Sequence, residues 1–260
     1  SLAKLDSLSD PQMVNELKTQ LTNATSPTPS VETILHAILP FKYVDHTHAD
    51  AVVTITNTTA GEDRIREIYG DRVVIIPYVM PGFDLAKDVA RIFSEQSTDK
   101  TEGMILMNHG IFSFGGNAKE SYDRMISLVN EAENYLVSNN AWDIDKSETN
   151  FSVKKIRNQV AELRQKISLT VGKPVLMSLT NSQLGLSFSN RKDVNEIATR
   201  GPLTPDHVIR TKRIPMIGRD VNKYNEEYAS YFSKNEINAK ARKTMLDSAP
   251  RVILDKEFGL

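Results

Sequence analysis

The chain of 260 residues has no cysteine, one tryptophan and no excess of charge of either sign. Without cysteine there are no disulfides and no thiolate ligands, so any bound metal must be held by histidine, carboxylate or water. No apolar run is long enough to cross a bilayer. Because 32 basic residues balance 33 acidic ones, the sequence gives no electrostatic support for binding to nucleic acid or to a membrane.

Several common signatures are also missing. The first residues, Ser-Leu-Ala-Lys-Leu-Asp, lack the apolar core of a signal peptide, and the absence of cysteine fits the cytoplasm. There is no Gly-x-Gly-x-x-Gly after a strand and no phosphate-binding Walker loop, so dinucleotide or nucleotide binding is unsupported. The Gly-x-Ser-x-Gly elbow of serine hydrolases is missing too.

The middle of the chain alternates between strand-like and helix-like patterns. Apolar runs at 72–78 and 103–107 are typical of strands covered on both faces. Asn117, with Glu120 three residues later, has capping-box spacing before a helix whose apolar residues are expected at Tyr122, Met125, Ile126, Val129, Ala132 and Leu136. Residues 25–140 are therefore predicted to form one α/β unit, a sheet with helices on both faces.

The remaining elements of this unit follow from local signals. Ser30 is expected to cap a helix over 31–39, Asp84 a helix that continues past Phe93, and 61–69 a short surface helix. Residues 45–56 are rich in β-branched side chains and are predicted to be a strand, and 111–114 should pair back on 103–107 as a hairpin.

Outside this unit the composition is more polar. A helix is expected over 8–24, and after Trp142 a charged helix over 151–168, a strand over 173–177 and a helix over 224–243. The later elements suggest a second, smaller region, which is either an appended subdomain or a connector.

Three of the five histidines occur in a pattern that suits a metal. His46-Thr47-His48 is expected in a strand, whose period of two puts both imidazoles on one face. His109, within Asn108-His109-Gly110, ends another strand, and Gly110 is expected to turn the backbone and leave room near an ion. Three imidazoles with an open fourth position are typical of a catalytic zinc site. Polar residues at a strand edge remain the alternative.

Glu32 and two further histidines have less certain roles. Glu32, near the start of its helix, is either favoured there by the helix dipole or is a general base beside the metal. His36 lies one turn later among apolar neighbours, which favours a structural role. His207, in a loop within a basic stretch at 191–213, is more simply a surface turn residue, and the basic residues are more simply a solvated face than a phosphate site.

These motifs, taken in order, resemble the class II aldolase/adducin family. The resemblance rests on Pro29-Ser-Val-Glu32, His46-Thr-His48 and Asn108-His109-Gly110 followed by a long helix, and on Ile76-Pro-Tyr-Val-Met-Pro-Gly82. It covers about residues 25–140. The later Gly201-Pro-Leu-Thr-Pro-Asp-His-Val-Ile-Arg-Thr-Lys212 resembles the middle of the bifunctional proteins that join a rhamnulose-1-phosphate aldolase to a short-chain alcohol dehydrogenase.

The resemblance implies a three-layer α/β/α fold around a mixed sheet. It also implies Zn²⁺ or another divalent metal held by His46, His48 and His109, with Glu32 as the acid/base residue. The implied reaction is reversible aldol cleavage of a ketose 1-phosphate, such as rhamnulose 1-phosphate, to dihydroxyacetone phosphate and an aldehyde. A phosphorylated sugar is the implied partner, and homo-oligomers, often with sites between subunits, are the implied assembly.

The resemblance leaves alternatives and departures. Relatives include sugar-phosphate epimerases and dehydratases, and adducin-like interaction modules that catalyse nothing. Residues 1–24 show no counterpart of the glycine- and asparagine-rich segment with which the family binds substrate phosphate. The expected division is a metal-binding domain at 1–145, apparently without its N-terminal part, and an extension at 146–260 leading toward an absent dehydrogenase domain.

Overall fold

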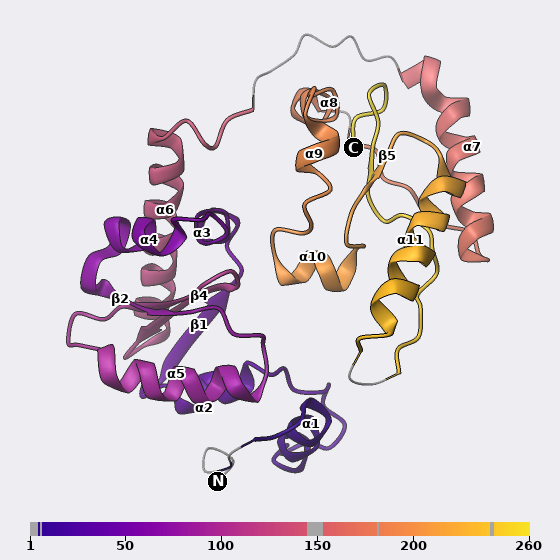
Figure 1. Ribbon diagram of the computed structural model, residues 1–260. Helices are drawn as coiled ribbons and strands as arrows, with labels where there is room; N and C mark the ends of the chain where they lie inside the picture. The colour runs from indigo at the N-terminus through magenta and orange to yellow at the C-terminus, as the bar shows by residue number, and fades with distance from the viewer. Residues whose placement is uncertain (1–4, 6, 145–152, 181, 240–241) are drawn as a thin grey trace. The chain divides into compact units, whose positions relative to one another are not determined.

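The computed structural model describes residue 5 and residues 7–144, 153–180, 182–239 and 242–260 (Figure 1). The chain divides into two compact units, Ser1–Trp142 and Asp143–Leu260. The expected boundary at 145/146 lies outside the described residues and stays a prediction. No helix among the described residues is long and apolar enough to span a membrane.

The first unit is built on a four-stranded mixed sheet in the order β1-β4-β3-β2. Strands β2 and β3 are parallel, and both other pairings are antiparallel. Leu106 pairs with Gly110, so the predicted hairpin is confirmed. The strands are β1 (Tyr43–Thr47), β2 (Val73–Ile76), β3 (Gly103–Leu106) and β4 (Gly110–Gly115).

Helices cover both faces of this sheet, with α3 and α4 on one side and α2 and α5 on the other (Figure 1). Alternate residues of β2 divide between two buried clusters, Val73 and Ile75 in one and Val74 and Ile76 in the other. The expected three-layer α/β/α fold is thus what the structure has. The helices of this unit are α1 (Asp10–Thr19), α2 (Thr33–Ile38), α3 (Asp50–Thr56), α4 (Gly61–Tyr69, followed by a 3₁₀ turn at Gly70–Arg72), α5 (Phe83–Gln96) and α6 (Ala118–Ser138).

The predicted strand over 45–56 is wrong beyond Thr47. The chain leaves β1 there and forms helix α3. Ala51, Val52 and Ile55 are buried in the cluster that α3 shares with α6, a spacing that suits one face of a helix. Packing of that face overrides the preference of β-branched residues for strands, which depends on context.

The helix boundaries show smaller differences. Asn117 caps α6 as predicted, because its side chain accepts from the backbone N–H of Glu120. The Glu120 carboxylate, however, accepts from the N–H of Gly116. Tyr122 and Ile126 were expected inside but are 61% and 44% exposed, because Ser121 and Leu128 take the inward face. Helix α5 starts one residue before Asp84, with Gly82 as its cap.

The second unit is mostly helical and has its own core of Ile156, Leu163, Ile167, Tyr224 and Phe258, among others. Two short strands pair in parallel, Met216 with Ile253 and Ile217 with Leu254. The predicted strand over 173–177 is wrong, since no strand forms there, and the helix expected at 224–243 ends at Glu236. Its elements are α7 (Val153–Val171), α8 (Gln183–Ser189), α9 (Val194–Ile197), α10 (Pro205–Arg210), β5 (Met216–Ile217), α11 (Val221–Glu236) and β6 (Ile253–Leu254).

Candidate metal centre

Three histidines meet at one edge of the first unit's sheet. Strands β1 and β3 run in the same direction, because each is antiparallel to β4. Their carboxyl ends therefore share an edge, where His46 lies near the end of β1, His48 follows it, and His109 lies in the turn after β3. The sheet topology thus brings together residues that are more than 60 positions apart in the sequence.

The ring nitrogens of these residues converge. One ligand atom from each of His46, His48 and His109 lies within 4.8 Å of the others. The Nε2 atoms of His46 and His48 are 3.1 Å apart, and the ring centroids of His48 and His109 are 4.9 Å apart. The expected strand ends at Thr47, one residue before His48, so the period of a strand does not account for the pair, although the two rings meet.

His46 is oriented by its surroundings. Its Nδ1 lies 3.0 Å from the carbonyl oxygen of Ile111. Because a carbonyl can only accept, Nδ1 carries the hydrogen and Nε2 keeps its lone pair toward the other two rings. Phe112, the cross-strand partner of His46, stacks on the imidazole with a centroid distance of 4.1 Å. The hydrogen bond to Ile111 is typical of a metal ligand, because ligand histidines commonly donate from their second ring nitrogen to a carbonyl or carboxylate.

His109 has buried nitrogens without partners. Its side chain is 3% exposed, and neither ring nitrogen makes a hydrogen bond within the described part of the chain. Such a group costs free energy in a folded protein and calls for an explanation, and a bound ion is one. Ring nitrogens without a hydrogen bond, beside two more imidazoles, suit the binding of a divalent ion, since neutral imidazole is the commonest metal ligand.

Burial keeps two of these imidazoles neutral. Desolvation lowers the pKa of His46 to about 3, against the hydrogen bond to Ile111 and with a contribution from the other histidines. Desolvation, with the neighbouring His48, lowers the pKa of His109 to about 4. Both rings are therefore unprotonated at neutral pH, which is the form that binds metal.

Glu32 is the carboxylate of this cluster. One of its oxygens lies 3.7 Å from Nε2 of His109, and its side chain is 20% exposed. The structure places Glu32 as the residue just before α2, without a capping hydrogen bond from its side chain. The expected cap, Ser30, instead accepts from the N–H of Glu32 at 3.2 Å. The carboxylate is thus directed to the histidines rather than used by its helix.

Two neighbours of His109 shape the turn. A Cβ on Gly110 would lie 2.5 Å from the oxygen of Thr47 and 3.0 Å from Cε1 of His46, so only glycine fits beside the rings. The expectation that Gly110 also makes the sharp turn is wrong. Asn108 makes it, with a φ of +58°, a conformation that asparagine adopts more readily than most residues. Nothing in the motif Asn108-His109-Gly110 distinguishes Asn108 as the residue with this conformation.

Neither of the other two histidines is among the three whose ligand atoms converge. His36 is exposed, and its ring packs against Phe112 at 5.4 Å between centroids. His207 belongs to α10 in the second unit, where its Nδ1 lies 2.7 Å from the hydroxyl of Thr204.

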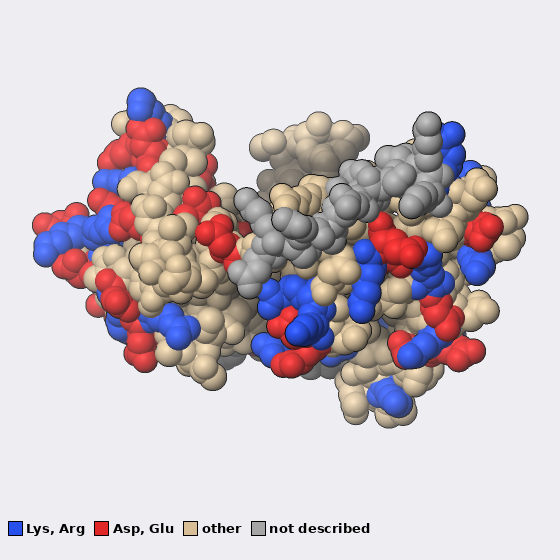
Figure 2. Space-filling model, turned by 90° about the horizontal axis from the view of Figure 1, so that it is seen from above, with Lys and Arg blue, Asp and Glu red and all other residues tan. Residues whose placement is uncertain are grey.

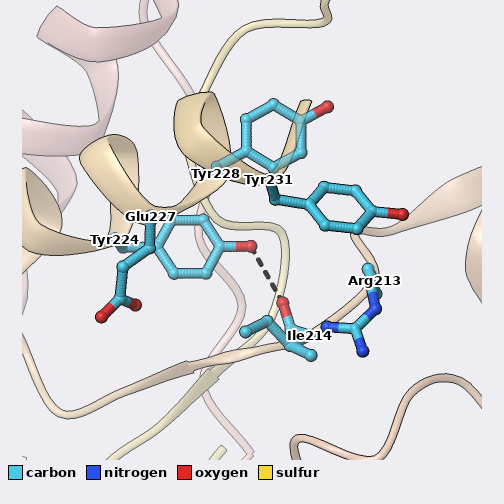
Figure 3. A pocket seen from close by; sticks show the side chains of 6 residues that line it. All are labelled: Arg213, Ile214, Tyr224, Glu227, Tyr228 and Tyr231. Carbon is cyan, nitrogen blue, oxygen red and sulfur yellow. Dashed lines mark hydrogen bonds between the residues drawn. The ribbon is translucent and has the colours of Figure 1, made fainter. Parts of the chain in front are cut away.

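The basic stretch at 191–213 is engaged in local contacts. Arg191 pairs with Asp193 and Arg200 with Glu196, and on the face shown in Figure 2 Lys and Arg lie among Asp and Glu. Arg213 lies near Tyr231 beside a cavity of about 40 Å³ (Figure 3). Pockets for small molecules are roughly 300–1,000 Å³, so this cavity is too small for a sugar phosphate.

Comparison with protein families gives two matches. Residues 3–136 match the model of the class II aldolase and adducin N-terminal domain. Residues 151–260 match the model described as the second domain of class II aldolase. The first match contains Glu32 and all three histidines.

Individual relatives are similar over part of their length. The Bacillus subtilis protein described as the uncharacterized oxidoreductase YuxG is 30% identical over 286 aligned residues, which cover all of this chain and 40% of that protein. The structure of an N-terminal class II aldolase domain from Thermoplasma acidophilum is 47% identical and has a TM-score of 0.47. The match covers 52% of this chain and 61% of the Thermoplasma chain. A sugar-phosphate aldolase from Thermotoga maritima is 17% identical with a TM-score of 0.37, covering 46% and 58%.

Proposed function

Because this chain belongs to the class II aldolase and adducin family, we propose that it is a metal-dependent lyase that cleaves a ketose 1-phosphate. Rhamnulose 1-phosphate is the proposed substrate, and dihydroxyacetone phosphate and an aldehyde are the proposed products. The observation that carries the proposal is the convergence of three imidazoles with a carboxylate 3.7 Å from one of them. A scaffold protein has no need of that arrangement.

His46, His48 and His109 are the proposed ligands of the metal, with zinc as the first candidate. Three neutral imidazoles leave further coordination positions for water or substrate, as in catalytic zinc sites. When bound, such an ion polarises a substrate carbonyl and stabilises the negative charge that develops on its oxygen. Manganese and cobalt fit the same donors, because imidazole accepts several divalent ions.

Glu32 is the proposed acid/base residue. Cleavage of the carbon–carbon bond leaves an electron pair on the carbon next to the carbonyl, and that carbon must take up a proton. In the direction of synthesis the same proton must be removed. A carboxylate beside the histidines, partly shielded from water, suits both transfers.

Product analysis tests the reaction. Metal-loaded protein is incubated with rhamnulose 1-phosphate and, separately, with fuculose 1-phosphate. We expect dihydroxyacetone phosphate to appear from at least one of them. An isomeric six-carbon sugar phosphate as the only product would instead identify an epimerase, and a six-carbon phosphate that has lost one water would identify a dehydratase. No turnover together with no bound divalent ion would identify an adducin-like interaction module.

A variant separates the roles of carboxylate and metal. Glu32→Gln keeps the size of the side chain but cannot transfer a proton as a carboxylate does. We expect the metal content to stay the same and the cleavage rate to fall on the order of a hundredfold. An unchanged rate would exclude Glu32 as the acid/base residue.

The organisation of the protein is part of the proposal. We propose a metal-binding domain at residues 1–145 and a second domain at 146–260, and a homo-oligomeric assembly. Light scattering of the purified chain tests the assembly, and a monomer at micromolar concentration would contradict it.

A further inference from the structure

Asn108 holds the turn that carries His109. Among the described residues, only Asn108 and Asn140 have a positive φ without being glycine. Asn108 lies between the end of β3 and His109, where the chain reverses into β4. A left-handed residue at this position sets the direction in which the next residue leaves the strand.

The side chain of Asn108 ties this turn to helix α3. Its Nδ2 donates to the carbonyl oxygen of Thr56 at 3.2 Å and to Oδ1 of Asn57 at 2.8 Å. Its backbone N–H donates to the hydroxyl of Thr56 at 3.2 Å. Thr56 is the last residue of α3, and carbonyls in a last helical turn lack partners within the helix. Three hydrogen bonds therefore join two segments about 50 residues apart.

The hydrogen bonds of Asn108 bear on the orientation of His109 but not on that of His46. His46 is oriented directly, through the hydrogen bond of Nδ1 to Ile111. His109 has no hydrogen bond on either ring nitrogen in the described structure, and the Glu32 oxygen 3.7 Å from its Nε2 is beyond hydrogen-bond distance, so no hydrogen bond fixes its ring. Its position depends on the backbone that carries it and on packing. A fixed backbone then orients His109, as a hydrogen-bonded partner orients other ligand histidines.

We propose that Asn108 is a positioning residue for His109, acting through its hydrogen bonds to Thr56 and Asn57. The inference rests on the proposed metal site. It predicts that the amide of Asn108, rather than its backbone conformation alone, contributes to metal affinity.

Two substitutions separate the amide from the backbone. Asn108→Gly tolerates a positive φ but removes both side-chain hydrogen bonds. Asn108→Asp keeps the shape, but a carboxylate cannot donate to the oxygens of Thr56 and Asn57. Asn140→Gly is the matched control, because Asn140 has a φ of +53° and follows the end of α6 instead of preceding a histidine.

Metal affinity is measured on the full chain by competition with a chelator, using Zn²⁺, and Co²⁺ gives a visible spectrum that reports ligand geometry. We expect Asn108→Gly and Asn108→Asp to weaken Zn²⁺ binding roughly 10–100-fold, the range typical of residues that support a ligand, and to alter the Co²⁺ spectrum. Asn140→Gly should stay within about twofold of wild type. Hydrogen exchange in β1–β4 checks that the variants remain folded.

A second pair of variants tests the Thr56 contact. Thr56→Ser keeps the hydroxyl that accepts from the N–H of Asn108, and Thr56→Val removes it with little change in shape. We expect weaker binding in the valine variant and near wild-type binding in the serine variant. A purely structural role would lower the protection of β3 against exchange but leave the Co²⁺ spectrum of the bound state unchanged.

The outcomes separate this inference from the proposed function. Wild-type Zn²⁺ affinity and an unchanged Co²⁺ spectrum in both Asn108 variants would overturn the positioning role and leave the metal site standing. Failure of the wild-type chain to bind Zn²⁺ or Co²⁺ would overturn both.

Discussion

Two buried polar residues, Asp255 in the second unit and His109 in the first, differ in their hydrogen bonds. In the second unit Asp255, 8% exposed at its side chain, accepts from Arg219 and from the backbone N–H groups of Glu257 and Phe258. In the first unit His109 is buried, and neither of its ring nitrogens makes a hydrogen bond to a residue that the structure describes. Partnered groups stabilise a fold, whereas unpartnered ones cost free energy, so the unpaired histidine indicates function rather than stability.

The pKa shifts show the same contrast. Burial alone would raise the pKa of Asp255, but the hydrogen bonds from Arg219 and from the backbone hold it below its usual value. For His109 burial is the main cause of the shift, and it lowers the pKa to about 4. The carboxylate is therefore kept charged by its hydrogen-bond partners, and the imidazole is kept neutral mainly by burial.

The largest expected effect comes from removing a ligand. His48→Ala leaves two of the three proposed imidazoles, so the metal affinity should fall by more than the ~10–100-fold typical of supporting residues. Metal analysis after dialysis should find near-stoichiometric ion in the wild type and almost none in the variant. Full metal occupancy in the variant would contradict the assignment of His48 as a ligand, and the buried histidines would no longer indicate a metal site.

The next effect concerns the partnered carboxylate. Asp255→Ala leaves two backbone N–H groups without their acceptor and leaves Arg219 with Glu257 as its remaining carboxylate partner, and we expect a loss of about 3 kcal/mol in the stability of the second unit. Hydrogen exchange can be read separately in peptides from β6 and from β3. Protection should fall in β6, while β3 and the metal content stay as in the wild type. Equal loss in both would show that the units do not unfold separately.

A pH titration tests the neutral imidazoles. In the unfolded chain His46 protonates as pH falls through about 6.5, while in the folded chain it stays neutral down to about 3. The unfolded state then binds more protons, so the stabilisation is complete above pH 6.5 and is lost as pH falls.

The measurement compares metal-free wild type with metal-free His46→Asn. Between pH 7 and pH 5 the wild type should lose about 2 kcal/mol more of its protection in β3 than the variant, which lacks the titrating group. Parallel pH profiles would show that burial does not hold His46 neutral.

The sequence predicted those parts of the fold whose signals are local or whose burial is complete. The apolar runs of β2 and β3 and the Asn117 cap of α6 belong to this class. The family motifs brought together His46, His48, His109 and Glu32, and the structure places them at one edge, although their role as ligands and acid/base residue stays a prediction.

The rest depends on contacts that are distant in sequence. Residues 50–56 have a strand-like composition but pack one face against α6 and form a helix. Asn108 finds its partners on α3, about 50 residues earlier, which no periodicity reveals. In the second unit the strands have two residues each, too few for alternation to be recognised.

The smallest expected effect is a gain in stability, opposite in sign to the loss expected for Asp255. His109→Leu replaces a buried ring that has no hydrogen bonds with an apolar side chain. Removing a buried unsatisfied polar group can be neutral or stabilising, so we expect the metal-free first unit to gain about 1 kcal/mol in stability, read from hydrogen exchange in β3 and β4. The same variant should bind no metal. Asp255→Leu in the second unit is the contrast, because that site has four hydrogen bonds to lose, and it should be destabilised. If His109→Leu destabilised the metal-free protein as much as Asp255→Leu does, His109 would have partners that matter for folding, and its burial would no longer indicate an ion site.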